Sequence, residues 1–157
     1  MQAILLFSHG SVQCGAEENL LRLARAMEMQ PDSPVVEVGF LNYSAPDLGS
    51  AVARCIARGA TSIAVVPYFL VAGKFVVEDL PRAIDALRVQ FTGIPISVAD
   101  PIGFHSELAG IILQAEASAR PPGDWLIRSP ISSEFCRNST RCPTNGTEYC
   151  PRSTEQK

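Results

Sequence analysis

No apolar run in this 157-residue chain approaches the roughly 20 residues that a membrane-spanning helix requires. An excess of one charge is also missing, since 13 Lys and Arg against 16 Asp and Glu leave a net charge of -3. This balance argues against nucleic acid as the main partner, because phosphate binding needs a concentrated basic face. Residues 1–7 lack the basic flank and the cleavage site of a signal peptide, and they resemble a buried strand. We therefore expect a cytoplasmic protein without a membrane partner.

An even set of cysteines and tight Cys-x-x-Cys pairs are absent as well. The chain has five cysteines, whereas a small secreted disulfide framework needs an even number. Cys136, Cys142 and Cys150 are separated by five and seven residues, unlike the paired ligands of zinc sites. They would hold an iron–sulfur cluster only with a fourth ligand, from Cys14, a non-Cys group or another subunit. We favour incidental thiols over such a cluster.

Four short apolar runs alternate with four helical patterns, and the length suits one domain. The runs are rich in Val, Ile and Leu, as strands covered on both faces should be: 3–7, 35–41, 62–70 and 94–99. Each helical pattern repeats apolar residues at a spacing near 3.6. In chain order, the four sets are Leu20, Leu21, Ala24 and Met27; Leu48, Val52, Cys55 and Ile56; Val76, Leu80, Ile84, Leu87 and Phe91; and Leu108, Ile111, Ile112 and Ala115. This order predicts an α/β fold of the flavodoxin-like kind, with three layers and a four-stranded, mainly parallel sheet.

Turn and cap residues fit the predicted helices. Asp47 follows Pro46 in the first turn of the second helix, and Gly59 stands where that helix should end. Pro81 must lie in the first turn of the third helix or kink it.

The composition changes near residue 120. Five of the twelve prolines fall from Pro121 onward, and apolar residues there are scattered apart from residues 125–127. We predict an α/β domain over residues 1–119 and a tail over residues 120–157, with a short docking segment and partial disorder.

Ligands of an open parallel sheet bind beyond the carboxyl ends of its strands. The loop after the first predicted strand carries Ser8, His9, Gly10 and Ser11, and the loop after the second carries Asn42. An imidazole can accept a proton or ligate a divalent metal near neutral pH. The absence of a side chain at Gly10 lets a flat ligand or another backbone approach closely. His9 is therefore the leading candidate, the alternative being a ring that only ties its loop to a carbonyl.

The third and fourth loops supply weaker candidates. Gly73, Lys74 and Phe75 precede Glu78, which either favours the helix start through the helix dipole or faces the cleft as an oxygen ligand for a metal. His105 could cap or pack against the fourth helix, or bind metal.

At these loops the sequence resembles the short CbiX-type sirohydrochlorin chelatases of the class II chelatase family. The resemblance covers roughly residues 2–115 and is carried by five stretches in order: residues 5–11 (LLFSHGS), 39–41 with Pro46, 65–73 (VVPYFLVAG), 76–81 and 101–105 (PIGFH). It implies a chelatase-like fold, often homodimeric, that inserts Co2+, Fe2+ or Ni2+ into sirohydrochlorin in cobalamin or siroheme-type biosynthesis. It also implies that His9 is both metal ligand and acceptor of pyrrole protons. Ser8, Gly10, Ser11, Asn42, Gly73, Lys74 and Phe75 are the expected substrate-binding residues, with His9, Glu78 and His105 as metal ligands.

Two positions depart from that family. Phe75 stands where a second histidine is usual, and Asn42 where an acidic residue is frequent. Phenylalanine can neither ligate a metal nor accept a proton. Either Glu78, His105 or Lys74 compensates, or insertion is slow, or the domain carries a tetrapyrrole or metal without catalysis. A third alternative is a generic flavodoxin-like domain that binds an anionic small molecule on the first loop.

Overall fold

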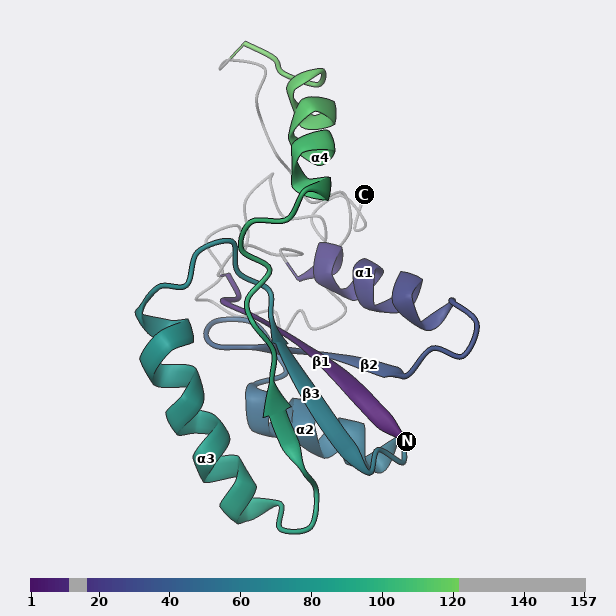
Figure 1. The fold of residues 1–157 in the computed structure, drawn as a ribbon, viewed down its shortest axis with the longest axis vertical. Coiled ribbons are helices and arrows are strands. Elements are labelled where there is room, and N and C mark those ends of the chain that lie inside the picture. The colour runs from purple at the N-terminus through teal and green to yellow at the C-terminus, as the bar shows by residue number, and fades with distance from the viewer. Residues whose placement is uncertain (12–16, 122–157) are drawn as a thin grey trace, which may run out of the picture.

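The computed structural model describes residues 1–11 and 17–121, and its elements alternate as the sequence predicts. The strands are β1 (Gln2–Ser8), β2 (Val35–Phe40), β3 (Ser62–Pro67) and β4 (Ile96–Val98). The helices are α1 (Glu18–Glu28), α2 (Leu48–Ala57), α3 (Leu80–Gln90) and α4 (Glu107–Glu116), with a π-helical turn, η1 (Phe75–Asp79), leading into α3. All three strand pairs are parallel, in the order β2-β1-β3-β4 (Figure 1). The predicted fold class is confirmed.

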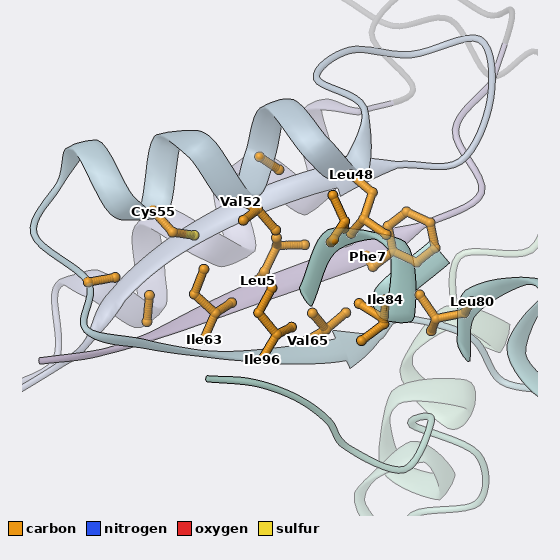
Figure 2. Packing of buried hydrophobic residues seen from close by; sticks show 14 residues of the cluster. Leu5, Phe7, Leu48, Val52, Cys55, Ile63, Val65, Leu80, Ile84 and Ile96 are labelled. Carbon is orange, nitrogen blue, oxygen red and sulfur yellow. The ribbon is translucent and has the colours of Figure 1, made fainter. Parts of the chain in front are cut away.

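The core lies mainly between the sheet and the helices α2 and α3. Leu5, Ile63 and Val65 point from the strands toward Val52 and Cys55 of α2, as Figure 2 shows, and all five side chains are fully buried. Ile84 of α3 joins the same cluster. A smaller cluster holds α1 against the other face through Leu20, Leu21 and Ala24, which pack with residues of β1 and β2. Helices thus lie on both faces of the sheet, which gives three layers.

Local signals define the helix ends, although Asp47 precedes α2 as its N-cap residue instead of lying in its first turn. The Asp47 carboxylate caps α2 by accepting from the Ser50 amide at 2.7 Å. At the other end Gly59 has φ of +87°, its amide donates to the Ile56 carbonyl, and the Ala60 amide donates to the Cys55 carbonyl. These two bonds form a Schellman ending, for which glycine is suited. Pro81 lies in the first turn of α3, as predicted, directly after the π-helical turn η1.

Two features differ from the sequence interpretation. The run at residues 35–41 contains a buried carboxylate, Glu37, which forms ion pairs with Arg54 at 3.2 Å and Arg58 at 3.0 Å. The hydrogen bond that Arg58 donates to the Glu37 carboxylate raises the pKa of the Arg58 guanidinium. The second difference concerns α4, whose predicted apolar stripe does not pack on the sheet: no residue of that helix is buried.

The C-terminal tail, residues 125–127 within it, and Cys14, Cys136, Cys142 and Cys150 lie outside the described residues. In the ranges that are described, every helix is too short or too polar to cross a bilayer.

Cys55 provides a test of the packing between α2 and the sheet. Burial, together with the charge of Glu37, raises the pKa of its thiol from 9.0 to about 12. Only the thiolate is nucleophilic, so at pH 8 the folded protein should hold roughly a thousandfold less reactive Cys55 than the unfolded chain. Site-resolved mass spectrometry after iodoacetamide treatment should find Cys55 unlabelled in buffer and labelled in urea. Equal labelling in both would show that α2 does not cover this side chain.

Candidate functional site

The strand order places a topological switch point between β1 and β3. The chain leaves β1 toward β2 on one side, and it reaches β4 from β3 on the other. Loops diverge at such a point, and ligands of open parallel sheets bind in the crevice that they leave. The loops that follow β1 and β3 therefore border the expected site, and the loop that follows β2 lies next to the first.

Backbone contacts join the loop after β1 to the loop after β2. The Leu41 amide donates to the Ser8 carbonyl and the Asn42 amide donates to the His9 carbonyl, both at 2.9 Å. Gly10 has φ of +80°, and a Cβ atom there would overlap with the Asn42 carbonyl. The close approach predicted at Gly10 is thus made by a neighbouring backbone.

The serines of these two loops add a second connection. The Ser11 amide donates to Ser44 Oγ at 3.1 Å, and Ser44 Oγ donates to the Ser11 carbonyl at 3.3 Å. Ser8 is half-buried at the end of β1, whereas Asn42 is exposed. Ser11 and Asn42 therefore hold the first two loops together through their backbones, while the Asn42 side chain faces solvent.

The imidazole of His9 is exposed at this carboxyl edge. Nδ1 lies 3.1 Å from the Gly10 carbonyl oxygen, so a proton on Nδ1 would be donated to that oxygen. In this tautomer Nε2 keeps its lone pair, and it has no hydrogen-bond partner within residues 1–11 and 17–121. The hydrogen bond to a carbonyl and a role as proton acceptor or metal ligand were given above as alternatives. One imidazole can serve both, because each uses a different ring nitrogen.

Two aromatic rings flank His9. The Phe75 ring meets the imidazole edge to face with centroids 5.7 Å apart, and the Tyr43 ring is tilted at 6.3 Å. Tyr43 is 72% exposed and has φ of +63°, a left-handed conformation that is costly for a residue with a Cβ atom. Such outliers gather at functional sites. Phe69, another aromatic residue near this edge, instead packs against Phe7 in the core.

The loop after β3 starts a helix with a widened turn. The Gly73 carbonyl accepts from the amides of Val76 and Val77, and Lys74 is exposed just before η1. Turns of this π type occur frequently at functional sites. Glu78 lies within η1 and forms an exposed ion pair with Arg82 at 3.8 Å.

His105 is placed as a helix-end residue. Its Nδ1 accepts from the Glu107 amide at 3.3 Å at the start of α4, which is the capping role that we considered. Across residues 1–11 and 17–121, no group of three His, Cys, Asp or Glu side chains is arranged to hold a metal ion. The structure thus brings Phe75 to His9, but it does not assemble His9, Glu78 and His105 into one ligand set.

Tyr43 and Ser44 were not among the predicted site residues. Their loop could be selected from the sequence because it follows a predicted strand. The positive φ of Tyr43 carries no sequence signal, since glycine, asparagine and aspartate are the residues that usually indicate that conformation.

The profile of the CbiX family matches residues 3–119. A curated relative, the sirohydrochlorin cobaltochelatase of Methanocaldococcus jannaschii, is 37% identical over 88 residues, which are 56% of this chain and 62% of that protein. The alignment thus covers less than two thirds of that relative.

Solved structures share the fold. A CbiX protein from Marinobacter aquaeolei matches with a TM-score of 0.62 and 28% identity, over 75% of this chain and 96% of that one. The sirohydrochlorin chelatase SirB from Bacillus subtilis subspecies spizizenii, solved in complex with cobalt, matches with a TM-score of 0.68 and 29% identity. That match covers 74% of this chain but only 50% of SirB.

Gly10 offers a test of how the first two loops are held. We expect Gly10→Ala to lower the free energy of unfolding by about 1–3 kcal/mol, because the new methyl group meets the Asn42 carbonyl and the positive φ disfavours alanine. Gly73→Ala is the matched control, since nothing lies within 4 Å of its added Cβ. It should change stability by less than about 1 kcal/mol in urea titrations. Equal effects of the two substitutions would contradict the packing of Asn42 on Gly10.

Proposed function

The chain belongs to the CbiX family, and from this membership we propose that it is a metal chelatase acting on sirohydrochlorin or a related tetrapyrrole. The substrates would be the macrocycle and a divalent ion, Co2+, Fe2+ or Ni2+, and the product would serve cobalamin or siroheme-type biosynthesis. The observation that carries the proposal is the exposed Nε2 of His9 at the switch point of the sheet.

Metal insertion requires a proton acceptor at that position. The macrocycle loses two pyrrole N–H protons as M2+ binds its four nitrogens, so each turnover releases two protons. Nε2 of His9 can take up a proton or contact the entering ion, while the Gly10 carbonyl keeps Nδ1 protonated and the ring oriented. The two protons would leave one after the other through His9 to solvent.

The surroundings of His9 suit a flat, acidic ligand. Phe75 and Tyr43 offer exposed aromatic surface beside the imidazole, and aromatic rings stack favourably on a planar macrocycle. We propose that Lys74 pairs with a substrate carboxylate, since a protonated amine cannot ligate a cation. The remaining contacts with the substrate would come from the first three loops, through Ser8, Gly10, Ser11, Asn42 and Gly73.

A carrier of the tetrapyrrole or the metal is the second candidate function. Phe75 favours it, because a ring that neither ligates nor accepts protons contacts His9 where the family usually has a histidine. Glu78 and His105 remain proposed additional ligands, although Glu78 pairs with Arg82 and His105 accepts from the Glu107 amide.

Other expectations remain proposals. We propose a homodimer, because the chain matches one half of SirB. We also propose a cytoplasmic location, a domain over residues 1–119 and a separate tail over residues 120–157, supported by the last described helix ending at Glu116. Incidental thiols at Cys136, Cys142 and Cys150 stay favoured over an iron–sulfur cluster.

His9→Ala tests the proton acceptor. We expect the rate of Co2+ insertion into sirohydrochlorin, followed by the absorption of the macrocycle, to fall by about 10²–10⁴-fold, the usual contribution of a general base. Met29→Ala, at an exposed position just after α1, is the control and should keep the rate. An unchanged rate in His9→Ala would place the base elsewhere. Tight binding by the wild-type protein without acceleration over the uncatalysed reaction would favour the carrier.

Phe75→His tests whether this position faces the path of the metal. A second imidazole beside His9 should tighten Co2+ binding by tenfold or more, as measured by calorimetry, because two ligands then share one ion. Phe75→Leu is the matched control, since it removes the ring without adding a ligand, and it should leave Co2+ affinity unchanged. Unchanged affinity in Phe75→His would mean that residue 75 does not face the metal.

A further inference from the structure

A tight turn of unusual conformation lies in the loop after β2. The Ser44 amide donates to the Asn42 carbonyl at 2.6 Å, and Tyr43 between them has φ of +63°. A hydrogen bond that spans two residues around a positive φ defines a γ-turn of the rarer, strained kind. Such a conformation is costly for a residue with a Cβ atom, and it persists only where its surroundings hold it. Contacts around Tyr43 must therefore keep this turn in place.

The loop after β1 contacts the turn at three points. The Asn42 amide donates to the His9 carbonyl at 2.9 Å. Gly10 packs against the turn, since an added Cβ atom would meet the Asn42 carbonyl and would lie 3.2 Å from the Ser44 amide nitrogen. Ser44 Oγ accepts from the Ser11 amide at 3.1 Å and donates to the Ser11 carbonyl at 3.3 Å. The first two contacts involve the backbone alone, whereas the third uses the hydroxyl of Ser44.

The turn places the ring of Tyr43 beside the imidazole of His9. The Tyr43 side chain is 72% exposed, so the fold gains little from it by burial. The imidazole is exposed as well, and its Nδ1 is bonded to the adjacent Gly10 carbonyl. Exposed side chains change rotamer on a timescale of picoseconds to nanoseconds. Contacts with the rings of Tyr43 and Phe75 therefore limit the directions in which Nε2 of His9 can point.

We propose that Ser44 is a positioning residue for metal insertion. Its hydroxyl keeps the γ-turn closed on the loop after β1, and the closed turn holds the ring of Tyr43 against the imidazole of His9. The bonds to Ser11 and His9 offset the cost of the left-handed conformation at Tyr43. This inference rests on the proposed function, because it assigns Ser44 to the orientation of the proposed proton acceptor.

The two histidines of the chain, His9 and His105, allow the contact to be followed by NMR. Ring currents displace the signals of nearby protons. In histidine-labelled protein the His9 ring signals should therefore move in Ser44→Ala, while those of His105 at the start of α4 stay in place. Ser44→Thr keeps the hydroxyl and should keep the wild-type signals.

Ser33→Ala is the matched control for the loss of a hydroxyl. Ser33 is half-buried like Ser44, and its Oγ donates to the Pro34 carbonyl at 3.1 Å in the loop before β2. This variant should leave the His9 signals unmoved. Unmoved His9 signals in Ser44→Ala, or the same displacement in Ser33→Ala or Ser44→Thr, would overturn the proposal.

Two substitutions of Tyr43 test the strained turn without any substrate. Tyr43→Gly and Tyr43→Ala both remove the ring, but only alanine keeps the Cβ atom that a positive φ disfavours. In urea titrations the unfolding equilibrium constant of Tyr43→Gly should be at least about threefold lower than that of Tyr43→Ala. An alanine variant as stable as the glycine variant would mean that the turn does not hold residue 43 in the left-handed conformation, which would overturn the proposal.

Metal insertion supplies the functional measurement. Ser44→Ala should lower the rate of Co2+ insertion into sirohydrochlorin by about tenfold or more, because a misplaced catalytic group loses its alignment with the substrate. Ser44→Thr should keep the rate. A wild-type rate in Ser44→Ala would overturn the positioning role alone. Absence of insertion by the wild-type protein would overturn the proposed function and, with it, this role of Ser44.

Discussion

The close approach of two backbones at Gly10 determines the geometry of the proposed site. The Asn42 carbonyl occupies the space that a side chain at residue 10 would fill, and the Asn42 amide bonds to the His9 carbonyl. The backbone of His9 is therefore held by main-chain contacts between the loops after β1 and β2, while its ring lies beside Phe75 and Tyr43. The imidazole is exposed, and its Nε2 has no hydrogen-bond partner among residues 1–11 and 17–121.

Burial and exposure are divided between different parts of the sheet. One face is closed by α2 and α3 around fully buried residues such as Leu5 and Val65, and this face fixes the strand order. The carboxyl edge keeps Tyr43 and Phe75 at least partly in solvent beside His9, although aromatic residues normally gain by burial. Under the proposed function, this exposed aromatic edge would face the planar macrocycle beside His9.

On the other face, Val66 of β3 packs against the α1 cluster, whereas Ser97 of β4 is exposed and α4 stands away from the strands. The match to SirB covers 50% of that longer chain.

Short-range patterns in the sequence were sufficient to predict much of the fold of this protein. Apolar runs located all four strands, and Asp47, Gly59 and Pro81 predicted the helix ends because caps act on their immediate neighbours. The position of His9 after the first strand predicted the exposed imidazole, since parallel strands place their following loops at one edge. Tertiary structure alone decided the contact of Tyr43 with His9, the pairing of Glu37 with Arg54 and Arg58, and the direction of α4. These depend on contacts between residues distant in the chain, and an apolar or charged side chain indicates that it needs a partner without indicating which one.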